Sequence, residues 1–239
     1  MTTPHPRAIP LRSLFPLALL LASLLLAACA KQQAVYQFNA VDHDYATDFA
    51  ATKDGQPLTG MLIRRWPIVS TDGTVVDHMP YRDGKLHGMF KRYDTDGSLA
   101  IAWPYENGLR EGVATWYRSD GTVAGTAIFK NGKRDGLEKW YNENGTLARE
   151  KTYVAGQQEG VEKWYYEDGT LRQTTSYKND KRDGQQVSYY ESGTIRTEIP
   201  YENGERHGLA KSYDTHGKLN GKALYRKGKL ISASGAAII

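Results

Sequence analysis

Residues 129–153, which read FKNGKRDGLEKWYNENGTLAREKTY, hold the pattern that decides the fold. The stretch begins and ends on an aromatic residue, and Tyr141 lies halfway between the two. Three glycines, Gly132, Gly136 and Gly145, separate short runs of β-prone residues. A glycine inside a helix costs about 1 kcal/mol relative to alanine, so this glycine content excludes a helix. The stretch reads instead as two short strands joined by turns.

The same pattern recurs along most of the chain. An aromatic residue appears at every twelfth position, thirteen times without a gap: Tyr81, Tyr93, Tyr105, Tyr117, Phe129, Tyr141, Tyr153, Tyr165, Tyr177, Tyr189, Tyr201, Tyr213 and Tyr225. Glycines recur at twice that interval in three series: Gly84, Gly108, Gly132, Gly156, Gly204 and Gly228, with Asp180 as the one departure; Gly88, Gly112, Gly136, Gly160, Gly184 and Gly208; and Gly97, Gly121, Gly145, Gly169, Gly193 and Gly217. Self-similarity at a fixed period indicates a repeat architecture, here with a 24-residue unit.

Each unit contains two turns. Asp or Asn precedes the glycine of the third series in Asp96-Gly97, Asp120-Gly121, Asn144-Gly145 and Asp168-Gly169. Such pairs between β-prone runs are the strongest short-range hairpin signal, because the turn needs a residue with positive φ. We expect a three-residue loop in which Asp94 pairs with Ser98 and Tyr93 with Leu99. The other turn, Asn131–Gly136 in the quoted stretch, is expected to be a longer loop that links one hairpin to the next.

These features predict an all-β protein. We expect an elongated array of antiparallel β-hairpins that forms a twisted, single-layer meander sheet, in which each strand contacts only its neighbours. Residues 54–230 are assigned to the array, with six complete copies from Tyr81 to Leu224, a degenerate copy before them and a fragment after them. Residues 29–53 are predicted to be a tether, with a first strand near 34–39, and residues 231–239 a tail.

Strict alternation along the strands predicts the two faces of the sheet. It places one set of residues on a tyrosine–leucine face: Met89, Lys91, Tyr93, Leu99, Ile101, Trp103 and Tyr105, and in later copies Leu137, Tyr141, Leu147, Tyr153, Val161, Tyr165, Leu171 and Tyr177. A single layer cannot bury this face fully, so it bends around itself, pairs with a second copy or accepts a ligand. The opposite face is predicted to be polar, with Glu138, Glu150, Glu162, Arg172, Arg196 and Glu198.

Three tryptophans interrupt the polar face at the same register. Trp116, Trp140 and Trp164 lie in successive copies, and Ser188 and Ser212 replace them in the later ones. Two strand spacings, about 9.5 Å, are expected between neighbours in this row. Tryptophan is enriched at binding hot spots, so the row is a candidate partner-binding stripe. The alternative is that the rings only cover backbone and pack on aliphatic stems.

The pattern Y-x-x-G-x-x-x-G with a following aromatic pair and D/N-G resembles the MORN repeat, in the variant form of bacterial lipoproteins and YwqK-type antitoxin proteins. The resemblance covers residues 54–230. It implies a single-layer β-sheet that binds or scaffolds other molecules, with no catalytic residues to carry over.

The N-terminus resembles a lipoprotein signal peptide over residues 1–28. Arg7 and Arg12 precede an apolar run from Leu17 to Leu26, which is shorter than the about 20 residues that span a bilayer. Residues 26–29, LAAC, resemble a bacterial lipobox, which implies cleavage before Cys29 and a lipid, including a palmitoyl-type acyl chain, on that residue. Ala30 in place of Asp favours the outer membrane by the same resemblance. The alternative is a plain secretory signal.

Composition excludes several classes of function. A single cysteine leaves no disulfide scaffold and too few thiolates for a zinc or iron–sulfur site. A net charge of +4 with 27 interspersed acidic residues is too small for a dedicated nucleic-acid binder. No nucleophile elbow, P-loop or dinucleotide fingerprint is present. His87 and His207 share a loop position with Glu111, Asp135, Glu159 and Asp183, which indicates a polar loop residue rather than a metal ligand.

The sequence therefore favours a lipid-anchored envelope protein that faces the periplasm and acts as a non-catalytic, protein-binding scaffold, without cofactors or metals. Self-association through the tyrosine–leucine face is a further expectation. The alternative is an antitoxin or immunity protein that neutralises a cognate toxin. A locally basic sheet edge offers direct membrane or glycan binding as another candidate, through Lys130, Lys133, Arg134, Lys178, Lys181 and Arg182.

Overall fold

A computed structural model describes residues 34–37, 42–44, 50–67 and 73–236. The chain divides into two units, Met1–Ala34 and Val35–Ile239. Its described residues form strands, turns and bends, with no helix among them. The lipobox and Cys29 lie outside the described residues.

The described part of the chain contains 22 strands. They are β1 Val35–Gln37, β2 Asp42–Asp44, β3 Ala50–Lys53, β4 Gln56–Pro57, β5 Gly60–Pro67, β6 Thr74–Arg82, β7 Lys85–Leu86, β8 Gly88–Tyr93, β9 Leu99–Glu106, β10 Leu109–Arg110, β11 Gly112–Tyr117, β12 Val123–Lys130, β13 Lys133–Tyr141, β14 Leu147–Val154, β15 Gln157–Tyr165, β16 Leu171–Lys178, β17 Lys181–Tyr189, β18 Ile195–Glu202, β19 Glu205–Arg206, β20 Gly208–Tyr213, β21 Leu219–Arg226 and β22 Lys229–Gly235.

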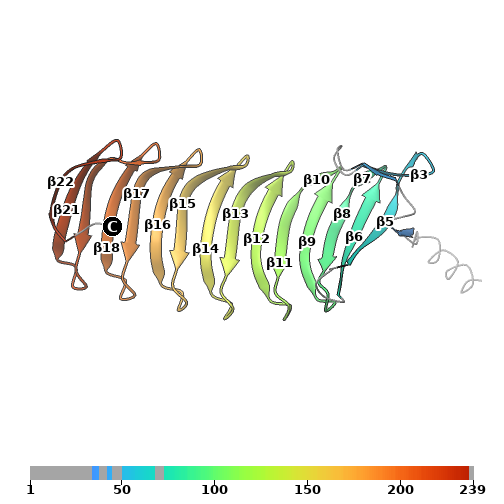
Figure 1. The fold of residues 1–239 in the computed structure, drawn as a ribbon, viewed down its shortest axis with the longest axis horizontal. Coiled ribbons are helices and arrows are strands. Elements are labelled where there is room, and N and C mark those ends of the chain that lie inside the picture. Colours follow the sequence, from blue (N-terminus) through green and yellow to red (C-terminus); the bar gives the residue numbers. More distant parts are fainter. Residues whose placement is uncertain (1–33, 38–41, 45–49, 68–72, 237–239) are drawn as a thin grey trace, which may run out of the picture. The chain divides into compact units, whose positions relative to one another are not determined.

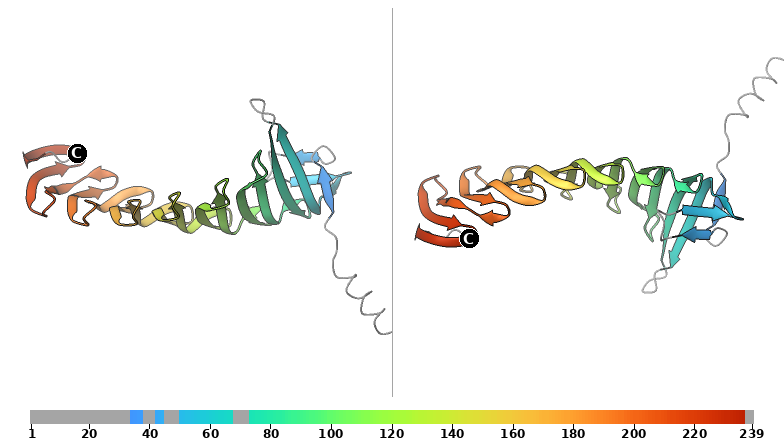
Figure 2. Two further views of the ribbon diagram at one scale, coloured as in Figure 1. Left: turned by 90° about the horizontal axis from the view of Figure 1, so that it is seen from below. Right: turned by 90° about the horizontal axis from the view of Figure 1, so that it is seen from above.

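From β5 onward the strands pair in chain order and antiparallel to one another (Figure 1). The same meander continues to β22, and the short strands β7, β10 and β19 extend the turn ends of the long ones. β1 adds a parallel strand beside β5. The hairpins from β11 to β22 form one layer of strands (Figure 2). The predicted all-β, single-layer meander of antiparallel hairpins is confirmed.

The strands reach beyond the predicted limits of the repeat array. β1, β2 and β3 lie within residues 29–53, and β22 extends to Gly235. Terminal repeats need a cap to cover their apolar residues, and β3 and β4 supply it. Ala51 N donates to Gly84 O at 2.9 Å, and Gly84 N donates to Leu58 O at 2.8 Å. Ala51 and Leu58 are buried in the largest core cluster, which also contains Leu62, Met79, Tyr81, Leu86 and Phe90.

The turn after β8 has the predicted geometry. Tyr93 pairs with Leu99, and Asp94 N donates to Ser98 O at 2.9 Å across a three-residue loop. Gly97 has a φ of +84°, the left-handed conformation that the loop needs. The Asp96 carboxylate accepts hydrogen bonds from Ser98 N at 2.9 Å and Ser98 Oγ at 2.7 Å, which fixes the loop.

The second turn is tighter than predicted. Lys130 pairs with Lys133, so only Asn131 and Gly132 form the loop, and the ladder resumes at once. Their φ values of +49° and +78° match a type I′ turn, which joins strands with two residues. The expected longer linking loop over residues 131–136 is therefore wrong. The chain is one continuous meander with alternating two-residue and three-residue turns.

Each two-residue turn is also held by the preceding repeat. Gly132 N donates to Arg110 O at 2.9 Å, and Gly156 N donates to Arg134 O at 2.7 Å. The same bond recurs at Gly108, Asp180, Gly204 and Gly228. The second glycine series, except Gly160, has a packing role: a Cβ on Gly136 would lie 3.0 Å from Ile128 Cδ1 of the neighbouring strand. These two series therefore set how closely neighbouring hairpins pack.

A β-bulge beside each three-residue turn corrects the predicted faces. In the β13–β14 pair, Trp140 lies opposite Arg149 and Tyr141 opposite Leu147, so Ala148 is an extra residue. A bulge breaks the strict alternation on which the prediction relied. We call the face with Ala114, Trp116, Ala127 and Phe129 the inner face, and the face with Val113 and Ile128 the outer face.

The correction moves whole series of side chains. Phe90, and not Met89, shares the inner face with Trp103, because their ring centroids lie 5.8 Å apart and Met89 is 42% exposed. Tyr153 belongs to the inner face, together with Glu138, Trp140 and Glu162, whereas Leu137 and Val161 point outward. Tyr165 and Tyr213 lie on the outer face, where their hydroxyls reach Glu150 and Glu198. The predicted tyrosine–leucine face is therefore wrong, since the periodic aromatic series alternates between the faces.

A substitution at Ala155 can test whether the left-handed conformation in the two-residue turns affects stability. It takes a φ of +50° at the position where Asn107, Asn131 and Asn203 stand in other repeats. A left-handed conformation costs residues other than Gly, Asn and Asp about 1–2 kcal/mol. We expect Ala155→Asn to raise the free energy of unfolding by about 1 kcal/mol in urea denaturation. The matched reverse change, Asn131→Ala, should lower it by a similar amount, and two changes of the same sign would contradict this account.

Candidate binding face

The middle of the inner face is filled by tryptophans. The Trp116 and Trp140 ring centroids lie 5.3 Å apart, and Trp103 lies 5.9 Å from Trp116 in an edge-to-face contact. The Trp116–Trp140 distance is shorter than the about 9.5 Å predicted for neighbours in this row, because the two large rings lean toward one another over small residues. A Cβ on Gly125 would lie 2.5 Å from the Trp140 ring, so glycine is required beneath it. Trp164 instead lies under the Arg149 guanidinium, 4.4 Å from the ring centroid.

The predicted stripe of Trp116, Trp140 and Trp164 thus lies in one register on the inner face, and all three rings are half-buried. They contribute to packing within this face. Their role in partner binding stays a prediction.

Two carboxylates are buried beside the tryptophans. Glu138 forms an ion pair with Arg134 Nε at 3.0 Å and accepts a hydrogen bond from Trp140 Nε1 at 3.2 Å. Glu162 forms an ion pair with Arg149 Nε at 2.7 Å. A buried charge needs such a partner, so these residues neutralise one another within the face.

Arginines stack on inner-face aromatics at the same position of four repeats. Arg110, Arg134, Arg182 and Arg206 lie 4.8, 5.3, 4.1 and 5.2 Å above the rings of Phe129, Tyr153, Tyr201 and Tyr225. Sequence reasoning placed Arg134 and Arg182 in a basic edge with neighbouring lysines and missed this ladder. The signal was present in the sequence, because each of these arginines precedes its aromatic partner by the same interval. Cation–π contacts of this kind stabilise the position of the guanidinium above the ring and hold the ring in place.

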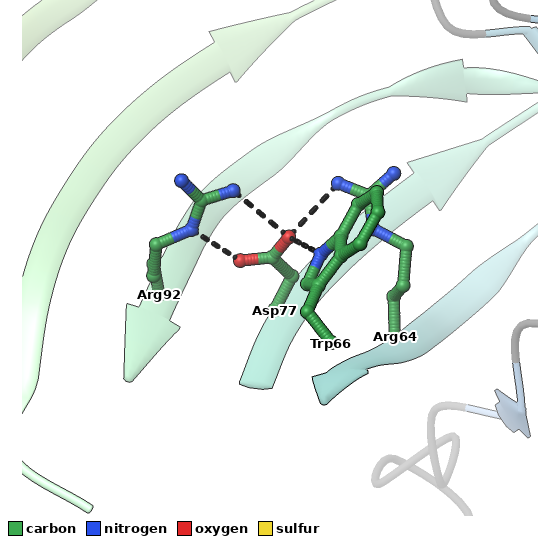
Figure 3. Close-up of polar contacts among 4 residues, drawn as sticks. All are labelled: Arg64, Trp66, Asp77 and Arg92. Carbon is green, nitrogen blue, oxygen red and sulfur yellow. Dashed lines mark hydrogen bonds and ion pairs between the residues drawn. The ribbon is translucent and has the colours of Figure 1, made fainter. Parts of the chain in front are cut away.

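The N-terminal end of the inner face is closed by a charge cluster around Asp77 (Figure 3). The Asp77 carboxylate is fully buried and accepts hydrogen bonds from Arg64 at 2.9 Å, Arg92 at 2.7 and 3.0 Å, and Trp66 Nε1 at 2.9 Å. Arg92 occupies the register of the tryptophans, so an ion pair replaces ring packing in this repeat. Burial alone raises the pKa of Asp77, but the donors on Arg92, Arg64 and Trp66 outweigh it and hold the pKa below its usual range.

The C-terminal end of the inner face is hollow. Ser188 and Ser212 stand where earlier repeats have tryptophan, and a cavity of about 450 Å³ opens over β16–β21. Its lining includes Arg172 and Arg196, which occupy the bulge position that is alanine in earlier repeats. The exchange of tryptophan and alanine for serine and arginine thus converts a packed surface into an open polar one.

The outer face carries an exposed aliphatic row. Met89, Val113, Leu137, Val161 and Leu209 occupy one position in five repeats and are 42, 52, 40, 44 and 45% exposed. Pro104, Ile128 and Leu224 lie directly opposite members of the row on the neighbouring strands. Thr152 and Ser176 lie opposite Leu137 and Val161, and Gln185 takes the row position in the repeat before Leu209. A recurring row of exposed apolar residues on one face is a candidate interaction site. Strict alternation had assigned these residues to the tyrosine–leucine face, so the sequence did not reveal them as a separate exposed aliphatic row.

Several of the remaining candidate residues have structural contacts, whereas the buried His87 Nδ1 has no hydrogen-bond partner among the described residues. Glu111, Glu159 and Asp183 each accept a hydrogen bond from the backbone N of the next two-residue turn, at Asn131, Asn179 and Asn203. His207 lies 3.5 Å from Lys227 N and 3.3 Å from Glu202, in agreement with a polar loop position. Among the described residues, no group of His, Cys, Asp and Glu could hold a metal ion, and no helix could span a membrane.

The repeat geometry agrees with a known family model. Five segments of the chain match the MORN repeat variant. They are residues 86–107, 134–155, 158–179, 182–203 and 206–227, and successive segments start one repeat unit apart except where a single unit is omitted. β10, β11 and β12 fill that gap with the same strands and turns. Five segments within the predicted array therefore match the MORN repeat variant.

Similarity to solved structures is remote. No curated protein sequence matches the chain at a significant level. A crystal structure of TarM aligns over 44% of this chain and 21% of TarM, with 13% identity and a TM-score of 0.29. A porin-like protein from Bacteroides uniformis aligns over 72% of this chain and 92% of its own length, with 12% identity and a TM-score of 0.22.

The Asp77 cluster predicts an acid-dependent stability. Because the folded-state pKa lies below the ordinary 3.8, the ionised carboxylate stabilises the folded protein above that value, and the contribution is lost as the pH falls through the lowered pKa. We expect Asp77→Asn to lower the free energy of unfolding by about 3 kcal/mol at pH 7, because it leaves buried arginine without its counter-ion. The difference from the wild type should shrink below pH 3.8 in denaturant titrations.

The control is Asp54→Asn, an exposed carboxylate at a φ of +53° that asparagine adopts equally well. This variant should unfold like the wild type. A pH-independent difference between Asp77→Asn and the wild type would contradict the assigned role of the charge.

Proposed function

We propose that this protein is a non-catalytic scaffold that binds a protein partner through the outer aliphatic row while a lipid on Cys29 holds it at the bacterial outer membrane, facing the periplasm. The MORN-variant repeats support a repeat-based binding scaffold. The exposed row from Met89 to Leu209 is the observation that carries the protein-binding part.

The row has the chemistry of a protein-binding surface. Its members repeat at the pitch of the array, so a partner can contact several equivalent positions at once. The outer-face residues beside the row are polar. Among them, Lys163 pairs with Glu150 at 2.7 Å and Lys211 with Glu198 at 3.4 Å. An apolar strip bordered by polar groups matches the core and rim of protein interfaces. Burial of each side chain contributes about 25 cal/mol per Å² of apolar area.

A scaffold without catalysis fits the charges of the inner face. Its buried carboxylates, Glu138, Glu162 and Asp77, are each held in an ion pair with arginine. Ion pairing of this kind supports a packing role for these groups in the proposed scaffold. The antitoxin alternative belongs to the same non-catalytic class and differs only in its partner.

The lipid anchor is tested at Cys29. We expect the wild type to incorporate labelled palmitate and to sediment with the outer membrane, because two or three acyl chains give stable anchoring. Cys29→Ser should lose both the label and the membrane fraction. A secreted but unlabelled wild-type protein would support the plain secretory signal instead.

The partner surface is tested by a matched pair of triple variants. One replaces Val113, Leu137 and Val161 with threonine, which retains β-propensity and removes apolar contact area. The other replaces Trp116, Trp140 and Trp164 with serine. We expect partners recovered by cross-linking in native envelopes to fall at least about tenfold for the threonine variant, as loss of hot-spot residues does.

Lys139→Thr is the control, because it lies on the outer face beside the row and should retain the partner. Circular dichroism and urea midpoints establish folding of each variant. If the folded tryptophan variant loses the partner and the threonine variant keeps it, the inner face is the binding face. A toxin among the recovered proteins, with toxicity after deletion only when its gene is present, would favour the antitoxin alternative.

A further inference from the structure

The hollow at the C-terminal end of the inner face has no part in the proposed protein contact. We propose that it binds an acidic saccharide, whose carboxylate pairs with Arg196 or Arg172 and whose hydroxyls bond to the amide and hydroxyl side chains of β17 and β18. At about 450 Å³ it has the size of a small-ligand site.

The charge of the hollow selects an anion. Arg172 and Arg196 line it, and no aspartate or glutamate does. Within the described part of the chain, their guanidinium groups contact only the rings of Tyr166 and Tyr190, at 6.0 and 5.9 Å, and form no ion pair. The other arginines of this face have closer partners. Arg134, Arg149, Arg64 and Arg92 pair with carboxylates, Arg182 and Arg206 donate to the Tyr201 and Tyr225 hydroxyls at 2.8 and 3.2 Å, and Arg110 lies 4.4 Å from the Trp103 ring centroid. An arginine fork binds a carboxylate with two parallel hydrogen bonds.

The tyrosines are fixed platforms beside these arginines. The Tyr166 hydroxyl donates to Tyr189 O at 2.8 Å, and the Tyr190 hydroxyl donates to Tyr213 O at 2.8 Å. Both rings therefore keep their orientation before a ligand arrives, which lowers the entropic cost of binding. The apolar face of a sugar ring can pack on such an aromatic platform.

The floor of the hollow needs a hydrogen-bond donor. Gln186 Oε1 is buried and has no hydrogen-bond partner among the described residues. Gln186 lines the hollow, and a ligand hydroxyl that reached Oε1 would satisfy this acceptor. Ser188 Oγ and Thr197 Oγ1 lie 2.6 Å apart and present further hydroxyl groups beside it. The ligand must therefore carry hydroxyl donors as well as a negative charge.

A saccharide fits this site better than an acidic peptide. Extended peptides commonly bind at a sheet edge through backbone hydrogen bonds. The hollow lies on a sheet face, where β17 is paired on both sides and its backbone groups are already used. Recognition here depends on side-chain amides, hydroxyls and aromatic rings, which suit a hydroxyl-rich ring.

The test is calorimetric titration of the purified full chain with digalacturonic acid, its neutral dimethyl ester and hexaglutamate. We expect the acid to bind and the ester to bind at least about tenfold more weakly, because a charge-assisted bond is lost. Arg196→Gln should weaken binding of the acid about tenfold. Ser188→Trp should abolish binding while the protein stays folded, because it restores the residue that fills this register in earlier repeats.

Arg226→Gln is the matched control, since Arg226 is exposed and lies outside the hollow. It should bind the acid like the wild type. Equal affinity for the acid and the ester, or unchanged binding by Arg196→Gln and Ser188→Trp, would overturn the proposal. Tighter binding of hexaglutamate than of the acid would assign the hollow to a peptide instead.

Discussion

The backbone hydrogen bond from each two-residue turn to the preceding repeat is the contact on which the rest of the structure depends. A single-layer sheet has no second layer to fix the angle between hairpins. The bond from Gly132 N to Arg110 O, and its equivalents at 2.7–3.1 Å, provide that restraint once in every repeat. Every turn that makes this bond has two positive-φ residues, as at Asn131 and Gly132 with +49° and +78°. At Asp180 the backbone bond is kept, and the carboxylate accepts a second one from Gln158 N at 2.7 Å.

The bulge beside the other turn decides what each face contains. It adds one residue per hairpin and thereby separates tyrosines that strict alternation would place together. The inner face then receives the aromatic, arginine and glutamate side chains that neutralise and cover one another. The same register of the repeat is occupied in three ways along the inner face. Tryptophan rings pack there in the middle, the ion-paired cluster at Asp77 occupies it near the N-terminal end, and small serines leave it open at the hollow.

The sequence predicted the fold well because glycine periodicity is a local property. Gly97 and its equivalents specify the three-residue turn directly, and the aromatic period counts the strands. The faces were not predicted, because a bulge at Ala148 depends on hydrogen bonding across two strands and leaves no mark in the hydrophobic pattern. The Arg134–Tyr153 contact joins residues of different strands, so the constant interval between them in the sequence can be recognised as a contact only once the register is known. Prediction of the hollow would have required both the strand register and the recognition that Ser188 stands where the preceding repeat has Trp164.

The alternation of the aromatic series between faces has a consequence for how such a chain can evolve. Gain or loss of one whole unit leaves every remaining side chain on its face, so gene duplication can change the reach of the array at little structural cost. Gain of half a unit would preserve the aromatic period yet exchange a two-residue turn for a three-residue one and turn the downstream faces over. Unequal crossing-over is therefore expected to leave viable proteins only in whole units.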